Sequence, residues 1–186
     1  MNYSHYGDLA VRLAVDLVNT LDTVKGVDGL ADLADLEAFV NRVGLDDAPA
    51  APTQADLEGV RSLRRLVRQV FEASDVERAA AAVNQILEDS KARPYISTHQ
   101  NRPHLHVEPR RAGLTRWLGA VVGMGLASVI IDQGTGRFGV CQAPDCRDVY
   151  IDLSRNRSRK HCSDACTNRE SVRSFRRRAG SGQQPA

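Results

Sequence analysis

Residues 141–178 read CQAPDCRDVYIDLSRNRSRKHCSDACTNRESVRSFRRR and hold all four cysteines of this 186-residue chain. Four residues separate the first two cysteines, three separate the last two, and fifteen residues lie between the pairs. A tetrahedral Zn²⁺ takes four thiolates at about 2.3 Å, and each close pair can supply two of them from one tight turn. The spacing therefore predicts one structural zinc ion held by Cys141, Cys146, Cys162 and Cys166.

The basic charge of the chain is concentrated in the same stretch. Between Arg147 and Arg178 ten Lys or Arg stand against four Asp or Glu, a net charge of +6. The whole chain carries +2, so the residues outside this segment sum to −4. Such a concentration of one charge is typical of a surface that contacts nucleic acid.

The order of local signals in this segment predicts a treble-clef-like zinc finger. A turn over Ala143–Asp145 would separate the first two ligands, after a short strand over 137–140. Residues 149–151 (VYI) read as a second short strand. Ser163 can cap a helix that begins at Asp164, and this helix would carry Cys166 in its first turn.

The expected C-terminal helix has an arginine face, because its arginines recur at spacings of three and four. The planar arginine fork can meet phosphate oxygens, or the edge of guanine, with two hydrogen bonds. The loop at 154–160 (SRNRSRK) adds charges suited to phosphates, whereas Val172 and Phe175 flank the arginine face and can pack inward. The predicted DNA contacts are Arg155, Asn156, Arg157, Arg159, Lys160, Asn168, Arg169, Arg173, Arg176 and Arg177. Asp152, Asn156 and Asn168 can equally be read as residues that hold the module together.

The run C-x4-C…D-x-S-R-N-R-S-R-K-x-C-S-x-x-C-T-N-R resembles the CGNR zinc finger of bacterial transcription regulators. The matching positions are Cys141, Cys146, Asp152, Ser154, Arg155, Asn156, Ser158, Arg159, Cys162, Cys166, Asn168 and Arg169. Residues 13–22 (LAVDLVNTLD) resemble the opening of the ABATE domain that accompanies this finger. Together the two resemblances cover nearly the whole chain. They imply a zinc-dependent DNA-binding regulator whose N-terminal part senses an unknown small-molecule effector or dimerises.

One position departs from the family pattern. Thr167 stands where the family name has glycine. If the position needs a positive φ, threonine would be strained there, whereas a helical position would tolerate it at small cost.

Composition and periodicity predict a mainly α (α+β) fold of one ordinary domain and one small one. We expect an ABATE-like helical regulatory domain over 1–133, a CGNR-type finger over 134–180 and a disordered tail over 181–186. Apolar periodicity predicts a helix over 8–23, with Asp8 as its N-cap, and a second helix from Leu33 to a stop at Gly44. A third helix is expected after Thr53, where Asp56 would complete a capping box. Two further helices are expected from about 76 to 90 and over 114–131. A small β-hairpin is expected from 95–98 and 105–107.

Several polar groups have plain structural interpretations. The row Arg61, Arg64, Arg65 and Arg68 is expected to form a solvated face of its helix. Asp16 and Asn19 share one side of the first helix and are expected to be exposed or to satisfy a buried hydrogen bond, rather than to line a pocket. The histidines of the hairpin, His99, His104 and His106, are expected to be exposed and not a second metal site.

Other classes of protein are disfavoured by the sequence. The apolar run 117–131 spans fifteen residues, short of the roughly 20 that cross a bilayer, so we expect a buried core helix and no membrane contact. The N-terminus does not read as a signal peptide, and the thiols indicate a reducing cytoplasm and not disulfides. Residues 134–139 match G-x-G-x-x-G, but a helix precedes them and a zinc knuckle follows, so no dinucleotide site is expected.

The leading hypothesis is a transcription regulator that binds duplex DNA. A treble-clef nuclease would need a histidine base and further metal ligands, and the module holds only His161, so no enzyme is expected. An RNA- or protein-binding module remains as the alternative, since basic stretches serve both purposes. A homodimer is suggested by the smooth face of Gly119, Gly123 and Ala127 and by the two-fold symmetry usual among DNA readers.

Overall fold

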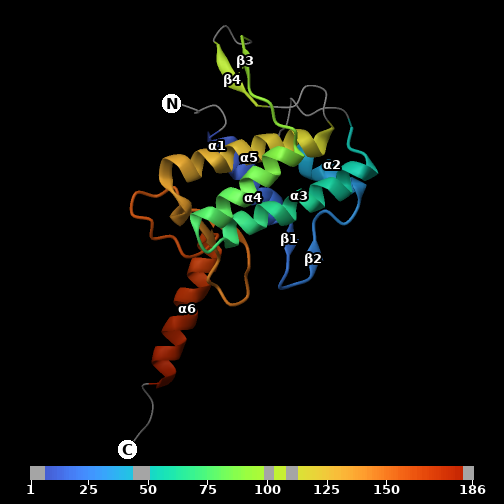
Figure 1. The fold of residues 1–186 in the computed structure, drawn as a ribbon. Helices are drawn as coiled ribbons and strands as arrows, with labels where there is room; N and C mark the ends of the chain where they lie inside the picture. The colour runs from blue at the N-terminus through green and yellow to red at the C-terminus, as the bar shows by residue number, and fades with distance from the viewer. Residues whose placement is uncertain (1–6, 44–50, 99–102, 108–112, 182–186) are drawn as a thin grey trace, which may run out of the picture.

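The computed structural model describes residues 7–43, 51–98, 103–107 and 113–181 (Figure 1). Within these ranges the chain forms six α-helices, one short 3-10 turn and three two-stranded antiparallel hairpins, which confirms the mainly α fold class. In order the elements are α1 (Gly7–Val18), β1 (Leu21–Asp22), β2 (Val27–Asp28), α2 (Leu33–Arg42), α3 (Gln54–Glu72), α4 (Val76–Asp89), β3 (Tyr95–Ser97), β4 (His104–His106), α5 (Leu114–Gln133), η2 (Thr135–Arg137), β5 (Phe138–Val140), β6 (Val149–Ile151) and α6 (Asp164–Ser181).

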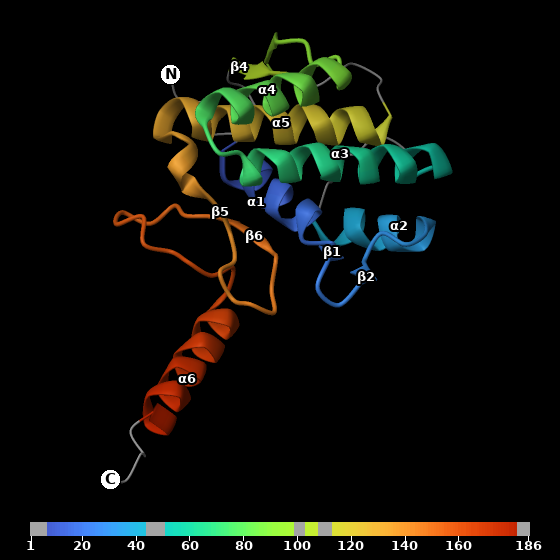
Figure 2. The ribbon, with the colours of Figure 1, turned by 60° about the horizontal axis from the view of Figure 1, so that its bottom comes forward.

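Helix α5 is the centre of the helical body and packs against α1, α3 and α4 (Figure 2). It is apolar on nearly every side, as a helix enclosed by protein must be. Leu118, Val122 and Leu126 are fully buried. By length and composition α5 could cross a membrane, but 61% of its apolar window is buried against the rest of the protein. It is therefore a core helix, as its sequence predicted.

The small residues of α5 allow its neighbours to approach closely. A Cβ added at Gly119 would lie 2.1 Å from Ser90 Oγ, and one added at Gly123 would lie 2.8 Å from Leu87 Cδ2. A Cβ at Gly125 would lie 2.7 Å from a carbon of α1. Gly119 and Gly123 of the predicted small-residue face are thus covered by α4 and its C-cap residue Ser90, and Gly125 lies against α1. The homodimer prediction loses this support, because the face it relied on is already covered.

Helix boundaries follow the capping signals closely. The predicted capping box of α3 is confirmed: Asp56 N–H donates to Thr53 Oγ1 at 3.2 Å, and Thr53 N–H donates to Asp56 Oδ2 at 3.1 Å. Asp32 and Asp75 are the N-caps of α2 and α4, and each side chain accepts from the backbone N–H three residues further on. The expected stop at Gly44 lies outside the described residues.

The first helix is shorter than predicted. It begins at Gly7, before the expected cap at Asp8, and ends at Val18 rather than at Thr23. Thr20 Oγ1 donates back to Leu17 O at 2.7 Å, and Gly29 N–H donates to Thr20 O at 2.7 Å. These bonds turn the chain into the β1–β2 hairpin, which the helical periodicity did not indicate.

Two arginines of the α3 row, Arg61 and Arg64, are structural rather than part of a solvated face. Arg64 is only 6% exposed and donates two hydrogen bonds to the Asp28 carboxylate, at 2.6 and 2.8 Å. Arg61 donates to the carbonyl of Leu30 at 2.8 Å. The solvated-face prediction is wrong for these two residues, because β2 and the chain just after it pack across α3 and offer them acceptors. Arg65 is exposed as predicted.

The predicted hairpin is confirmed as β3 and β4, with Tyr95 opposite His106 and Ser97 opposite His104. Of its histidines, His104 and His106 lie in β4, and His99 lies outside the described residues.

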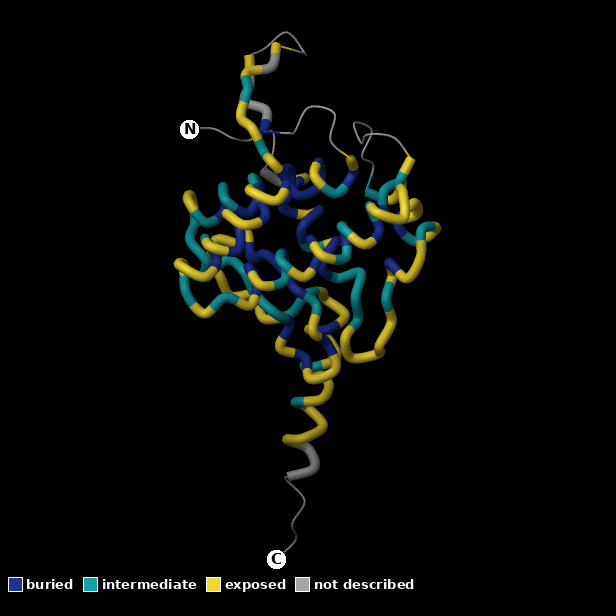
Figure 3. The backbone as a smooth tube through the Cα atoms, turned by 45° about the vertical axis from the view of Figure 1, so that its right-hand side comes forward, coloured by how far each residue is buried: buried dark blue, intermediate teal, exposed yellow. Residues whose placement is uncertain are grey.

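The first half of the expected finger is part of the main core. Val149 and Ile151 of β6 are buried in the same hydrophobic cluster as the helices. Phe138 of β5 meets Phe71 of α3 edge to face, with ring centroids 5.3 Å apart. Helix α6, in contrast, leads away from the helical body (Figures 1 and 3). The predicted tail is partly helical, because α6 continues to Ser181; residues 182–186 lie outside the described ranges.

Candidate metal centre and nucleic-acid interface

The four cysteines converge on one point. Their sulfur atoms all lie within 4.8 Å of one another. The Sγ of Cys162 is 3.6 Å from that of Cys146 and 3.6 Å from that of Cys166. Four sulfurs at about 2.3 Å from a central zinc would be about 3.8 Å apart at the corners of a regular tetrahedron. The cluster therefore fits one structural zinc ion, in agreement with the sequence.

Local hydrogen bonds position each pair of ligands. Cys146 N–H donates to Ala143 O at 3.0 Å and closes the predicted knuckle. Cys141 N–H donates to Asp148 O at 2.8 Å and joins the knuckle to the start of β6. On the other side, Ser163 Oγ accepts from Cys166 N–H at 3.3 Å, as an N-cap of α6 should. A knuckle, a hairpin and a helix that carries the last ligand give the treble-clef-like arrangement that was predicted.

Burial favours the protonated form of two of the thiols. Burial raises the pKa of the Cys146 thiol to about 11, and burial also raises that of Cys162. Burial acts to raise the pKa of Cys166 as well, but the hydroxyl of Ser163 and the neighbouring thiol of Cys162 bring it below its ordinary value. Zinc binding must displace the protons of the buried thiols, so the metal and the folded finger stabilise each other.

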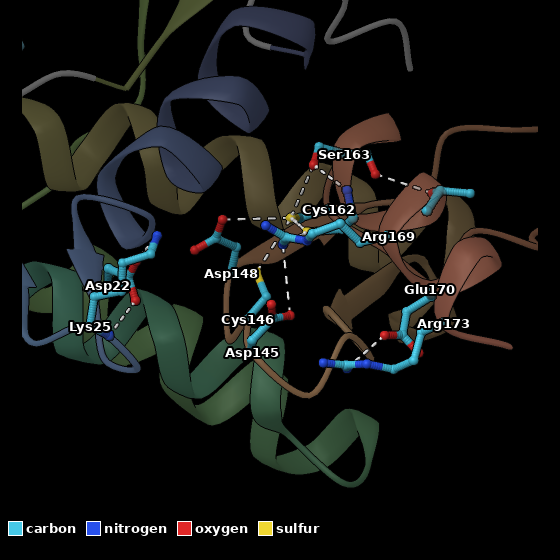
Figure 4. A network of polar contacts seen from close by, with 12 residues as sticks. Asp22, Lys25, Asp145, Cys146, Asp148, Cys162, Ser163, Arg169, Glu170 and Arg173 are labelled. Atoms are coloured by element: carbon cyan, nitrogen blue, oxygen red, sulfur yellow. Dashed lines mark hydrogen bonds and ion pairs between the residues drawn. The ribbon is translucent and has the colours of Figure 1, made fainter. Parts of the chain in front are cut away.

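Arg169 is exposed, but its guanidinium reaches this cluster (Figure 4). Its Nη2 donates to Cys166 Sγ at 3.0 Å and lies 3.8 Å from Asp145 Oδ1. Nearby negative charge, first that of Cys166 and then that of Asp145, raises the pKa of the guanidinium. Four thiolates around Zn²⁺ carry a net charge of −2, and Arg169 supplies a counter-charge.

The structure thus places Arg169 at the metal centre, although the sequence grouped it with the DNA contacts. The sequence could have indicated this contact, because Arg169 follows Cys166 by three residues and residues three apart on a helix are neighbours.

Asp152 is a structural residue. It is 4% exposed, and its carboxylate accepts from Ser154 N–H at 2.9 Å and from Arg159 N–H at 2.8 Å. Hydrogen bonding with Ser154, and then with the backbone of Arg159, holds the pKa of Asp152 below its ordinary value. The geometry therefore supports a structural role for Asp152, in which its carboxylate holds the zinc module together.

Tyr150 and Arg159 fix the other end of the same loop. The Tyr150 hydroxyl donates to Arg159 O at 2.7 Å, and the Arg159 guanidinium lies 5.2 Å from the centre of the Tyr150 ring. Arg159 Nε donates to His161 O at 2.9 Å, and its Nη2 donates to Cys162 O. Arg159 therefore joins the loop to the metal ligands through its own side chain.

The rest of the basic loop is open to solvent. Arg155, Asn156, Arg157 and Lys160 are exposed. Arg157 has a φ of 49°, in the left-handed region, and follows a turn at residues 155–156. The loop is anchored at both ends and presents its charged side chains outward between the anchors.

The outer part of α6 carries the remaining predicted contacts. A groove of about 670 Å³ along it is lined by Asp145, Asn168, Arg169, Val172, Arg173, Arg176 and Arg177. Arg173 pairs with Glu170 of the same helix at 2.9 Å, and both lie on the projecting helix. The predicted inward packing of Val172 and Phe175 is wrong: their side chains are 50% and 66% exposed, because α6 projects beyond the body that would have covered them.

Thr167 is accommodated because it is helical. It lies in the first turns of α6, and its N–H donates to Ser163 O at 3.1 Å. Among the described residues, positive φ angles outside glycine occur at Lys91 and Arg157. Threonine in place of the family's glycine therefore causes no backbone strain at this position.

Asn19 connects the metal-binding segment to the helical body. Its Nδ2 donates to Val149 O at 3.0 Å, and its Oδ1 accepts from Val149 N–H at 2.8 Å. The prediction that Asn19 satisfies a buried hydrogen bond is confirmed, and Asp16 is exposed. Its partner, 130 residues away, could not be read from the sequence.

Comparison with known families places these features in context. No curated protein matches the chain. Residues 137–179 match the family described as the CGNR zinc finger, which agrees with the cysteine geometry. Residues 11–133 match ABATE, described as "Putative stress-induced transcription regulator". The chain therefore belongs to the ABATE family and carries a CGNR zinc finger after the ABATE domain.

Proposed function

We propose that the chain is a zinc-dependent, DNA-binding transcription regulator that acts in the cytoplasm. The observation that carries the proposal is α6: it begins at the metal cluster, projects from the body and bears five arginines against two acids. Its arginines and the exposed loop at 154–160 supply the charge that a phosphate backbone needs. Zinc fixes the first turn of α6 to the knuckle and so sets the direction of this charged helix.

The proposal gives zinc a structural role. Four thiolates fill a tetrahedral shell and leave no position for substrate or water, so we propose no catalytic step. Incubation of the zinc-loaded protein with plasmid DNA and Mg²⁺ tests this point, and cleavage would contradict it.

Selection of bound duplexes from random DNA, with and without a zinc chelator, tests the proposal directly. We expect enrichment that disappears on chelation. Four to six phosphate contacts give a log–log salt slope near −4 to −5, at about −0.9 for each phosphate. Alanine at Arg173 and Arg176 should reduce the slope by about 2. Binding that does not depend on salt, or none to any duplex, would refute the proposal.

The alternative partner is RNA or an acidic protein surface, because the same charges attract any polyanion. Competition between duplex DNA and structured RNA for the purified protein separates the two. A homodimer and a small-molecule effector of the N-terminal domain stay predictions. A groove of about 550 Å³ between α3 and α4, lined in part by Leu66, Glu72 and Arg78, offers a place to test effectors.

A further inference from the structure

The α6 helix carries an exposed apolar strip in the middle of its charged surface. Val172 and Phe175 are three residues apart and lie on one side of the helix with Asn168. Arg169 and Arg176 border this strip. Phosphate contacts do not require exposed apolar side chains, so Val172 and Phe175 point to a ligand that also has an apolar edge.

We propose that Asn168, Val172 and Phe175 form a reading edge for A·T base pairs in the major groove of duplex DNA. This inference rests on the proposed DNA-binding function and deepens it. In the major groove thymine presents its 5-methyl group, which apolar side chains contact, and adenine presents a donor and an acceptor that asparagine matches. The edge carries both kinds of group within about two turns of one helix.

The dimensions of α6 and its surroundings favour this ligand. The helix has 18 residues, about 27 Å at 1.5 Å per residue, and the major groove admits a helix of ordinary diameter. Because α6 projects from the body, the helical body does not cover the strip (Figure 3). Arg176, beside the strip and away from the metal cluster, would then meet a phosphate on the groove wall.

The same charges oppose a second copy of the chain on this face. If two copies paired strip to strip, Arg169 and Arg176 of both would border one interface, and like charges at an interface are unfavourable. A polyanion with apolar groups in its groove satisfies both features of the surface.

The test compares randomised duplex pools that contain thymine with the same pools made with deoxyuridine, which lacks the 5-methyl group. Binding is measured with the zinc-loaded full chain at fixed salt. We expect deoxyuridine to weaken binding about fourfold for each thymine methyl group that the strip touches, the factor that corresponds to about 0.8 kcal/mol per buried group. The double variant Val172→Ala/Phe175→Ala should bind both pools equally and keep the salt slope of the parent protein. Ile131→Ala is the matched control, because Ile131 is 76% exposed on α5, and it should keep the difference between the pools.

Each possible result of this test either supports or refutes the proposed reading edge. Equal binding of both pools by the parent protein, with salt dependence intact, would refute the reading edge but leave the proposed function standing. A parent protein that is dimeric and becomes monomeric in the double variant would also refute it, because a second copy would then occupy the strip. Failure to bind either pool would refute the proposed function and the inference together.

Discussion

Substituting Asn19 with alanine should loosen the finger from the helical body, although Asn19 lies far from the metal. In β5–β6 the bonds from Cys141 N–H to Asp148 O and from Asp152 N–H to Arg137 O mark the hydrogen-bonded positions. Val149, opposite Val140, falls between them at a non-hydrogen-bonded position. Its N–H and C=O therefore point away from β5, and the Asn19 amide pairs with both.

The magnitude follows from those two bonds. They are 2.8 and 3.0 Å long, and Val149 is fully buried. Each bond contributes about 1 kcal/mol net, and a buried backbone group left without a partner costs about 1–3 kcal/mol. We therefore expect Asn19→Ala to lower the free energy of unfolding by about 2–4 kcal/mol.

Urea denaturation of the zinc-loaded protein measures this loss, and amide hydrogen exchange locates it. The Val149 N–H should exchange faster in the variant, because it loses its acceptor. Asn41→Ala, at an exposed position of α2, is the matched control and should change stability by less than about 0.5 kcal/mol. If Asn19→Ala behaves like this control, and Val149 remains protected, the bonds between Asn19 and Val149 are not significant for stability.

Four further changes test the metal centre, the core and the loop. Cys162→Ser should abolish stoichiometric zinc binding and unfold α6, while β5–β6 stays folded in the main core. Zinc analysis and circular dichroism measure these two effects, and retained zinc would contradict the ligand set. Arg169→Ala should weaken zinc binding by about 10- to 100-fold in a chelator competition, and Arg169→Lys by less, because only the charge is kept. The hydrogen bonds from Arg64 hold the pKa of Asp28 below its ordinary value. Their contribution to stability is therefore present above the unfolded-state pKa and is lost as the pH falls through the lower folded-state pKa. Asp28→Asn should flatten the profile of stability against pH in that acidic window, and an unchanged profile would count against the pair. Arg157→Gly should stabilise the protein by up to about 1 kcal/mol, because the left-handed conformation suits glycine. The same change should weaken duplex binding and lower the salt slope by about 0.9, because one phosphate contact is lost. Unchanged binding would remove Arg157 from the proposed interface.

The proposals for α6 depend on the metal in different degrees. Zinc sets the direction of the helix, whereas the identity of the side chains at 168, 172 and 175 sets what it can read. Chelation should therefore abolish all duplex binding, but substitution of the apolar strip should change only the response to the thymine methyl group.

Features that depend on near neighbours in the chain were predictable. The four ligands follow from cysteine spacing, because a knuckle and the first turn of a helix bring residues four or five apart to one metal. The α3 capping box and the Ser163 cap were correct for the same reason, since each joins residues three apart. The apolar α5 also read correctly as a buried helix.

Contacts between distant residues were decided by the tertiary structure alone. The partner of Arg64 is 36 residues away, and that of Asn19 is 130 residues away. Periodicity shows that a helix has a distinct face, but it does not show what covers that face. The small face of α5 therefore suggested a second copy, but its glycines are covered by α4 of the same chain. Val172 and Phe175 suggested a core, but they are exposed to solvent. Sequence determined the metal ligands and the capped helix starts of this protein, because those interactions are local. Folding decided which charges are buried and which apolar groups stay exposed, because burial depends on the packing of the whole chain.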